Sequence, residues 1–394
     1  MARKKYDYII LGSDICALII ANSLQQSNKK VLIIEPGNQI GDRIRPVQAN
    51  FGSLPLSFRD LNPSEQTNLS LGRFLNFIGL ESGYTKITRS FKTFESGKFK
   101  DFLGFGKTPP AFMDLLDDML STERIELDEE PKIWFEKLTE NLNCDIELGS
   151  QVTDFIIEEK NIQLVEVNDS RFFEGNEIIN CLPIEEILEL KTADLVSKKN
   201  RQKIAKTQRW STLQLSLVHK ANDAPDSSEF QYVLRGGTDK SVPCFGFFSE
   251  PTNFEGLEDV YQVSHWISYL ESELTDDMES SGTLAREMKR QIKRAFPELM
   301  NSTVFEKIQL SPNTMGRTEL HLQAFREKHL TNFSNLCPIG DFDHQTSSRI
   351  HNSIQWLEEN NLDLIAIKPD QELETDLEEL EDSPLDQETV QPLF

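Results

Sequence analysis

The residues whose types and spacing could support chemistry begin at the N-terminus, in the stretch YDYIILGSDICALIIANSLQQSNKKVLIIEP at residues 6–36. Gly12, Asp14 and Ala17 fall on the three positions of the G-x-G-x-x-G/A turn that holds the pyrophosphate of a dinucleotide. Glu35 falls where an acidic residue binds the ribose in such proteins. Glycine at the first position and alanine at the third fit this turn, but Asp14 at the second departs from it.

The departure at Asp14 changes what the turn can bind. Glycine at this position lets the backbone approach the phosphates, whereas a carboxylate fills that space and repels them. Aspartate is also a preferred N-cap, so Asp14 could accept a hydrogen bond from the N–H of Cys16 or Ala17 and occupy the anion site itself. Ser13 belongs to the same turn and is counted with it as a candidate cofactor-binding residue. Two interpretations therefore stay open, a dinucleotide site and a buried βαβ unit without a ligand.

The elements that must position these residues are a strand, a helix and a second strand. Residues 6–11 are β-branched and aromatic, residues 14–27 form an apolar helical segment, and residues 31–34 are wholly apolar. This order and spacing predict the opening βαβ unit of a Rossmann-like fold.

Composition narrows the classes of function. A chain of 394 residues is long enough for two domains with separate cores. The net charge of −24 makes nucleic acids and anionic membrane surfaces poor partners. No long uncharged apolar window predicts a transmembrane segment. Five scattered cysteines without a C-x-x-C pair, and six histidines without an H-E-x-x-H motif, favour a reduced cytoplasmic protein without a metal site.

The rest of the chain alternates between strand-like and helix-like segments. Residues 146–182 contain three short alternating strands, and residues 64–140 look mostly helical or irregular, with helices near 64–78 and 111–120. Residues 210–220 alternate as a strand, with CFGFFSE and YQVSHWISY as partners in an antiparallel sheet. A charged helix within residues 270–296, a strand at 335–342 and a helix at 347–359 follow. The tail at 369–394 carries ten acidic residues and no basic one, which predicts a disordered extension able to meet a protein partner.

This order of elements resembles the flavin amine oxidase superfamily, which includes protoporphyrinogen oxidase-like and phytoene desaturase-like proteins. The resemblance spans roughly residues 5–362 and also rests on the segments PGNQIGDRIRP, IINCLP and NLCPIGDF. It implies an α/β fold, with a Rossmann-like FAD/NAD(P)-binding domain and an inserted α+β substrate domain built on an antiparallel sheet. The expected FAD-binding domain comprises residues 1–54, 141–200 and 331–368, and the substrate domain comprises residues 55–140 and 201–330.

The resemblance also implies roles for individual residues toward FAD. Gly12 and Ala17 match the pyrophosphate turn, and Glu35 matches the acid that binds the adenosine ribose. Gly41 and Arg43 match the outer positions of the G-G-R loop beside the diphosphate.

Two later positions match as well. Val152 matches the residue whose backbone contacts adenine, and Gly340 with Asp341 matches the late Gly-Asp that faces the diphosphate and the ribityl chain. No catalytic residue is identified.

Three cofactor-contacting turns have lost their small residues. The changes are Asp14, Asp42, and the residues Asn352, Ser353, Trp356 and Leu357, which stand where the family has G-A-x-x-S-G. Together they argue for weakened or abandoned FAD binding. Two functions therefore remain open. The first is an FAD-dependent oxidoreductase that moves a hydride from a C–N or C–C bond of a small or lipophilic substrate to flavin. The second is a pseudoenzyme on the same fold that acts as a binding or escort protein without redox activity.

Overall fold

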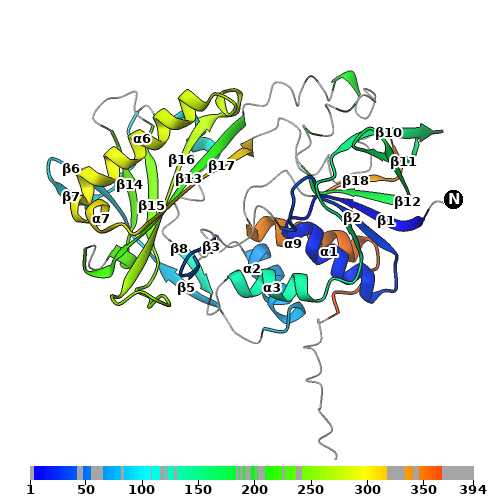
Figure 1. Ribbon diagram of the computed structural model, residues 1–394, viewed down its shortest axis with the longest axis horizontal. Coiled ribbons are helices and arrows are strands. Elements are labelled where there is room, and N and C mark those ends of the chain that lie inside the picture. The colour runs from blue at the N-terminus through cyan, green and yellow to red at the C-terminus, as the bar shows by residue number, and fades with distance from the viewer. Residues whose placement is uncertain are drawn as a thin grey trace, which may run out of the picture.

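The computed structural model describes residues 4–41, 48–54, 65–80, 84–107, 109–115, 120, 123–127, 131–182, 186, 190, 197–199, 202, 209–223, 227–236, 242–316, 333–339 and 346–365. Two large sheets dominate this part of the chain, and helices pack on one face of each (Figure 1). The predicted α/β fold with a Rossmann-like sheet and a second, largely antiparallel sheet is confirmed.

The first sheet contains the N-terminal βαβ unit. Its parallel strands lie in the order β9 (Asp145–Glu147), β2 (Val31–Ile34), β1 (Lys5–Leu11), β12 (Arg171–Asn180) and β18 (Leu336–Pro338). Strands β10 (Val152–Glu158) and β11 (Asn161–Val167) extend it as an antiparallel meander beside the first half of β12. Segments far apart in sequence thus meet at one end of the sheet, where β1, β12 and β18 finish.

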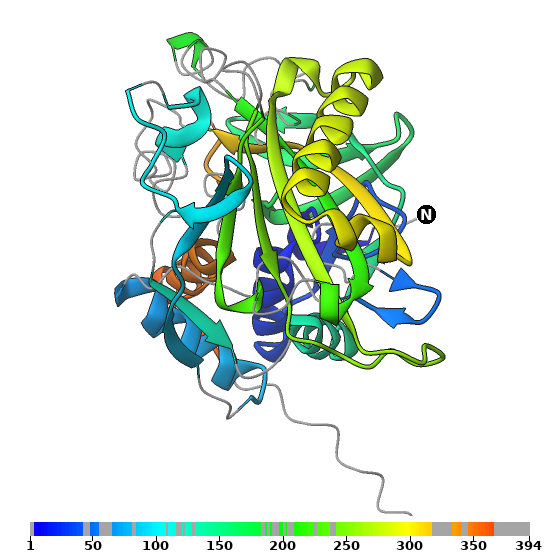
Figure 2. The same cartoon turned by 90° about the vertical axis from the view of Figure 1, so that its left-hand side faces the viewer.

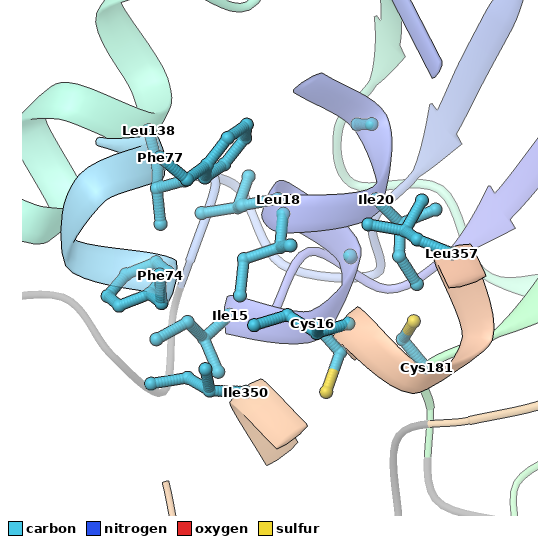
Figure 3. Packing of buried hydrophobic residues seen from close by; sticks show 14 of the residues in the cluster. Ile15, Cys16, Leu18, Ile20, Phe74, Phe77, Leu138, Cys181, Ile350 and Leu357 are labelled. Carbon is cyan, nitrogen blue, oxygen red and sulfur yellow. The ribbon is translucent and has the colours of Figure 1, made fainter. Parts of the chain in front are cut away.

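Burial on both faces explains why β2 is wholly apolar and why β1 ends in the apolar run Ile9–Leu11. On one face, Ile10 and Ile33 pack with α1 (Ile15–Gln26), α2 (Glu65–Phe77), α3 (Pro131–Glu140) and α9 (Thr346–Glu359). On the other face, Ile9 and Leu32 pack with the meander. Helix α1 is buried from Ile15 to Leu24 because α9 and α3 also contact it, as the close-up shows (Figure 3). The apolar run from Ile15 to Ala21 therefore reflects its central position.

The second sheet has seven strands. Their order is β17 (Phe305–Gly316), β13 (Arg209–Lys220), β16 (Tyr261–Glu271), β15 (Cys244–Phe248), β14 (Gln231–Leu234), β6 (Phe91–Glu95) and β7 (Lys98–Asp101). Pairing is antiparallel except between β14 and β6, which run parallel. The alternating segments at 210–220, 244–250 and 261–269 do pair as predicted.

Helices α6 (Met278–Ala295) and α7 (Pro297–Ser302) cover one face of this sheet, called here the outer face (Figure 2). The opposite face, called here the inner face, packs against two short elements. One is the short helix η1 (Ala111–Leu115), and the other is the hairpin of β3 (Gln48–Ala49) and β4 (Gly52–Ser53). Since β3 and β4 follow the first βαβ unit in sequence, this hairpin joins the two halves of the molecule.

The sequence analysis was wrong about part of the segment at 64–140. Helix α2 forms as expected, but the described residues also contain β6, β7, β5 (Tyr84–Thr88) and β8 (Glu123–Leu127). These strands are short and rich in Lys and Glu, and β7 is exposed along its length. Their apolar alternation is weak because they lie at a sheet edge, next to that edge, or in a two-stranded pair.

Gly246 should be essential to the outer face of the second sheet. A Cβ atom there would overlap the ring of Trp266, which is fully buried beneath α6. Gly246→Ala should lower the free energy of unfolding by about 3 kcal/mol, because neither the ring nor the strand can move away. Gly282→Ala, in an open position of α6, should instead raise it by about 0.5 kcal/mol. Urea denaturation that gave equal values for both variants would contradict this packing.

Two buried histidines should make stability depend on pH. Burial lowers the pKa of His219 on the outer face and of His265 on the inner face from 6.5 to about 4. The unfolded chain therefore binds these protons more readily, so their contribution is fully present above about pH 6.5 and is lost as the pH falls toward 4. Each histidine should account for up to about 3 kcal/mol of that loss. The variant His219→Gln/His265→Gln should show a shallower decline between these pH values in urea titrations, and an unchanged slope would refute the assignment.

Candidate functional site

The turn after β1 keeps the backbone geometry of the motif. Gly12 has a φ of +90°, in the left-handed region that favours glycine. A Cβ atom on Gly12 would lie 3.0 Å from Cδ2 of Leu182, so the turn also packs closely against the residues that follow β12. The Gly12 N–H donates to the Ile34 carbonyl at 2.8 Å, which ties the turn to the end of β2. The first glycine is thus required here by the fold itself, with or without a ligand.

Asp14 caps helix α1. Its Oδ1 accepts a hydrogen bond from the Ala17 N–H at 3.0 Å, and its backbone is extended, as in an ordinary N-cap. Only 8% of the residue is exposed. The carboxylate therefore occupies the helix N-terminus at the N–H groups that would otherwise be free to bind an anion. Of the two donors considered from the sequence, the structure selects Ala17.

Arg349 completes this arrangement from the other end of the chain. It lies in the first turn of α9, and its Nη1 donates to Asp14 Oδ2 at 3.3 Å. The two side chains are 11% and 8% exposed, so the ion pair is buried. The Cys16 thiol also donates to the Arg349 carbonyl at 3.3 Å, which fixes the start of α9 against the start of α1. A carboxylate and a guanidinium from two helix N-termini thus neutralise one another where the motif would place phosphates.

Glu35 lies at the end of β2 and is held by protein donors on both oxygens. Oε1 accepts from the Gly37 N–H at 2.7 Å, and Oε2 accepts from the Ser13 hydroxyl at 2.5 Å. The Ser13 Oγ in turn accepts from the Gly41 N–H at 2.8 Å. Ser13, Glu35 and Gly41 therefore form one buried hydrogen-bonded chain that closes the turn onto the loop after β2.

The other predicted site residues fall into two groups. Val152 opens β10, is buried, and pairs with Val167 across the meander. Arg43, Gly340 and Asp341, together with Asp42, lie outside the described residues.

The large residues of α9 serve as packing. Trp356 and Leu357 belong to the core cluster beneath the first sheet, and the Trp356 ring meets the Tyr8 ring edge-on at 6.3 Å. Ser353 is buried and donates to the Arg349 carbonyl at 2.9 Å, while Asn352 is also buried. The positions at which the family has small residues are here filled by side chains that hold α9 in place.

Cys181, which follows β12, lies in the same buried region (Figure 3). Burial and the negative charge of Asp14 raise the pKa of its thiol well above the ordinary value. The thiol is therefore protonated at neutral pH and is a poor nucleophile. All five cysteines are free thiols.

Sequence reasoning missed Arg349 and Leu182. Arg349 carries a usable signal, because a cation in the first turn of a helix is unfavourable unless a carboxylate faces it. Leu182 carries none, since only the pairing of β1 with β12 brings it to Gly12. Within the described ranges, no group of three or more His, Cys, Asp or Glu side chains is placed to hold a metal ion. Among the helices that the structure describes, none is long and apolar enough to cross a membrane.

Comparison with known proteins adds the fold relationship. No family model and no curated protein sequence matches the chain. The structure superimposes on an oxidoreductase from Methanosarcina mazei with a TM-score of 0.61 and 13% identity, over 90% of this chain and 100% of that one.

Two further solved structures agree. An Exiguobacterium sp. 255-15 protein named provisionally as a protoporphyrinogen oxidase gives a TM-score of 0.63 at 10% identity, over 91% of this chain and 99% of that one. Putrescine oxidase bound to putrescine gives a TM-score of 0.62 at 11% identity, over 91% of this chain and 100% of that one. At these identities the likeness shows the fold and not the activity. The chain therefore shares its fold with these three proteins, as the order of its elements predicted.

Proposed function

We propose that this chain is a binding protein on the flavin amine oxidase fold, in which an internal ion pair has replaced dinucleotide binding. The observation that carries the proposal is the buried contact between Asp14 and Arg349. A pyrophosphate bound at the α1 N-terminus would need the Ala17 N–H, which Asp14 already occupies, and would approach a buried carboxylate. The residues present at this turn do not fit FAD or NAD(P).

The ion pair is also costly to remove. Breaking a buried pair leaves an uncompensated charge, which is strongly unfavourable. A dinucleotide would have to displace the Asp14 carboxylate from Arg349 and from Ala17 before its phosphates could take their place. We therefore infer that the site has become a structural joint between α1 and α9, and that the function lies in binding elsewhere on the fold. A small or lipophilic molecule fits such a role, and a protein partner for the acidic tail is a further part of the proposal.

A second candidate function is an FAD-dependent oxidoreductase acting on a C–N or C–C bond. It is favoured by the left-handed Gly12, by Glu35 at the end of β2, and by the fold shared with oxidases. For this function Asp14 would have to leave the turn when the cofactor binds. A titration of the wild-type protein with FAD separates the two candidate functions.

FAD and ADP should fail to bind the wild-type protein in calorimetric titrations, and the purified protein should lack the visible absorption of oxidised flavin. Asp14→Gly should bind both more tightly than wild type, because it frees the Ala17 N–H and leaves Arg349 to meet a phosphate. Asp277→Gly is the matched control, since Asp277 caps α6 through Glu279 and Ser280 far from the turn. Saturable FAD binding by the wild-type protein, or an affinity of Asp14→Gly for FAD no higher than that of wild type, would contradict the proposal.

The ion pair should also be visible in stability. Asp14→Asn keeps an N-cap but leaves Arg349 with a neutral partner, and Arg349→Met leaves the carboxylate without this guanidinium. Each should lower the free energy of unfolding by about 3 kcal/mol. The double variant Asp14→Asn/Arg349→Met should lower the free energy of unfolding by clearly less than the sum of the two single effects. In the double variant, neither charge is left facing a neutral partner.

A surface pair provides the control for that cycle. Arg290 and Glu287 form an exposed pair on α6, with side chains 75% and 21% exposed. Arg290→Met should cost at most about 0.5 kcal/mol. Strict additivity in the Asp14 and Arg349 cycle, measured by urea denaturation, would show that the two side chains act independently.

A further inference from the structure

The inner face of the second sheet carries two separate hydrophobic clusters. At one end, the cluster under η1 contains Phe91, Phe112, Met113, Trp210, Val233, Phe245 and Tyr269. At the other end, the cluster under the β3–β4 hairpin contains Leu54, Val218, Phe254, Tyr261 and Val263. The residues that cross the sheet between these clusters belong to neither of them.

Strand register defines the residues between the clusters. Ser216 of β13 pairs with His265 of β16, His265 pairs with Phe247 of β15, and Phe247 pairs with Gln231 of β14. Paired residues point to the same face of a sheet, so these four side chains form one line across it, called here the transverse row. Its members place a hydroxyl, an imidazole and an amide between the two apolar clusters of this face.

One buried hydrogen bond links His265 to the neighbouring strand. The Gln214 amide donates to Ser216 Oγ at 3.3 Å, and Ser216 Oγ lies 2.9 Å from His265 Nδ1. We take the Ser216 hydroxyl as the donor to Nδ1, which places the proton of the neutral imidazole on Nε2. His265 is 1% exposed, and its Nε2 is buried without a hydrogen-bond partner in the part of the chain that the structure describes.

A buried polar group without a hydrogen-bond partner is unfavourable, so its presence needs an explanation. The side chains around His265 on the inner face are less buried than those of a packed core. Gln214, Phe247 and Ile267 are its neighbours on the inner face, and each is only partly buried. Directly behind them on the outer face, Leu215, Trp266 and Gly246 are fully buried. The inner face is thus least covered around the unpaired donor.

We propose that the transverse row is the binding site of an apolar molecule that carries a neutral carbonyl oxygen. The oxygen accepts a hydrogen bond from His265 Nε2, and the apolar part of the molecule packs against Phe247 and Ile267. The site specifies the ligand class of the binding function proposed above and rests on it in that sense. The imidazole is uncharged at neutral pH, so it matches a ketone, ester or amide better than a carboxylate.

Access to the donor depends on Phe247. Its ring lies 5.2 Å from the imidazole, centroid to centroid, with an angle of 33° between the planes. Phe247 is partly exposed, and the proposed ligand reaches the imidazole from the inner face when this side chain rotates. The row continues on β17 with Lys307, which is exposed at the open side of the sheet. A carboxylate ligand would favour Lys307, which separates the two ligand classes in an experiment.

The test uses methyl hexyl ketone and the hydrocarbon of the same shape in which a methylene group replaces the carbonyl oxygen. Histidine-selective nitrogen-15 NMR of the full chain should show His265 protonated at Nε2. The ketone should shift this signal in a saturable way and the hydrocarbon should not. His219 is the internal control, because its Nε2 is likewise buried without a partner in the described chain, but on the outer face. Its signal should not respond.

Variants separate the two nitrogens of the ring. His265→Gln retains a donor near the position of Nε2, whereas His265→Asn can only replace Nδ1 toward Ser216. Ketone affinity should fall roughly tenfold in His265→Asn and less in His265→Gln, as expected for one lost hydrogen bond. His219→Asn should bind the ketone as wild type does.

Several results would overturn the proposal. They are a proton on Nδ1 of His265, equal binding of ketone and hydrocarbon, tighter binding of octanoate than of the ketone, and unchanged affinity in His265→Asn. The tautomer and the ligand comparison are measured on wild type, so they decide the question even if a variant fails to fold. Flavin binding by wild type would contradict the loss of the dinucleotide site, and it would leave the His265 measurements to decide this site alone.

Discussion

The buried contact between the Asp14 carboxylate and the Arg349 guanidinium is the interaction on which the arrangement of the first sheet depends. It joins the N-termini of α1 and α9, two helices that start 331 residues apart in the chain and pack against each other beneath the sheet. Both helix N-termini carry partial positive charge, so bringing them together requires a negative group between them. In a dinucleotide-binding protein a pyrophosphate can supply it. Here Asp14 supplies it from within the chain, and Arg349 balances the charge.

This exchange explains why the neighbouring positions have also changed. In the proposed absence of a cofactor, the inward residues of α9 are free to be large, and Trp356 and Leu357 fill the core against Tyr8 and α1. Ser13 and Glu35 bond to one another and close the turn onto Gly41. The fold is thereby kept by side chains where a ligand would otherwise contribute, since anything that binds only the folded state stabilises it. Binding can then move to the second sheet, whose inner face has the less complete packing.

Local features of the chain were predictable and long-range ones were not. The βαβ opening follows from the glycine at position 12 and the two largely apolar strands around the helix, and the cap at Asp14 follows from its position before an apolar helix. Arg349 was not predicted, because nothing near it in sequence identifies its partner. The role of His265 depends on the register between β13 and β16, and strands β6 and β7 at one end of the second sheet take their structure from their partners more than from their own residues. Arg43, Gly340 and Asp341 stay predictions.

The central claim is that the Ala17 N–H is already bonded to Asp14 and cannot bind a phosphate. Backbone amide NMR of the wild-type protein during an ADP titration measures this directly, because pyrophosphate bound at the α1 N-terminus would bond to that N–H. We expect the Ala17 amide signal to stay unchanged even in a large excess of ADP, since Asp14 Oδ1 accepts its hydrogen bond at 3.0 Å. A large, saturable shift of the Ala17 signal would show that the nucleotide displaces Asp14, and it would contradict the claim that the ion pair has replaced the ligand.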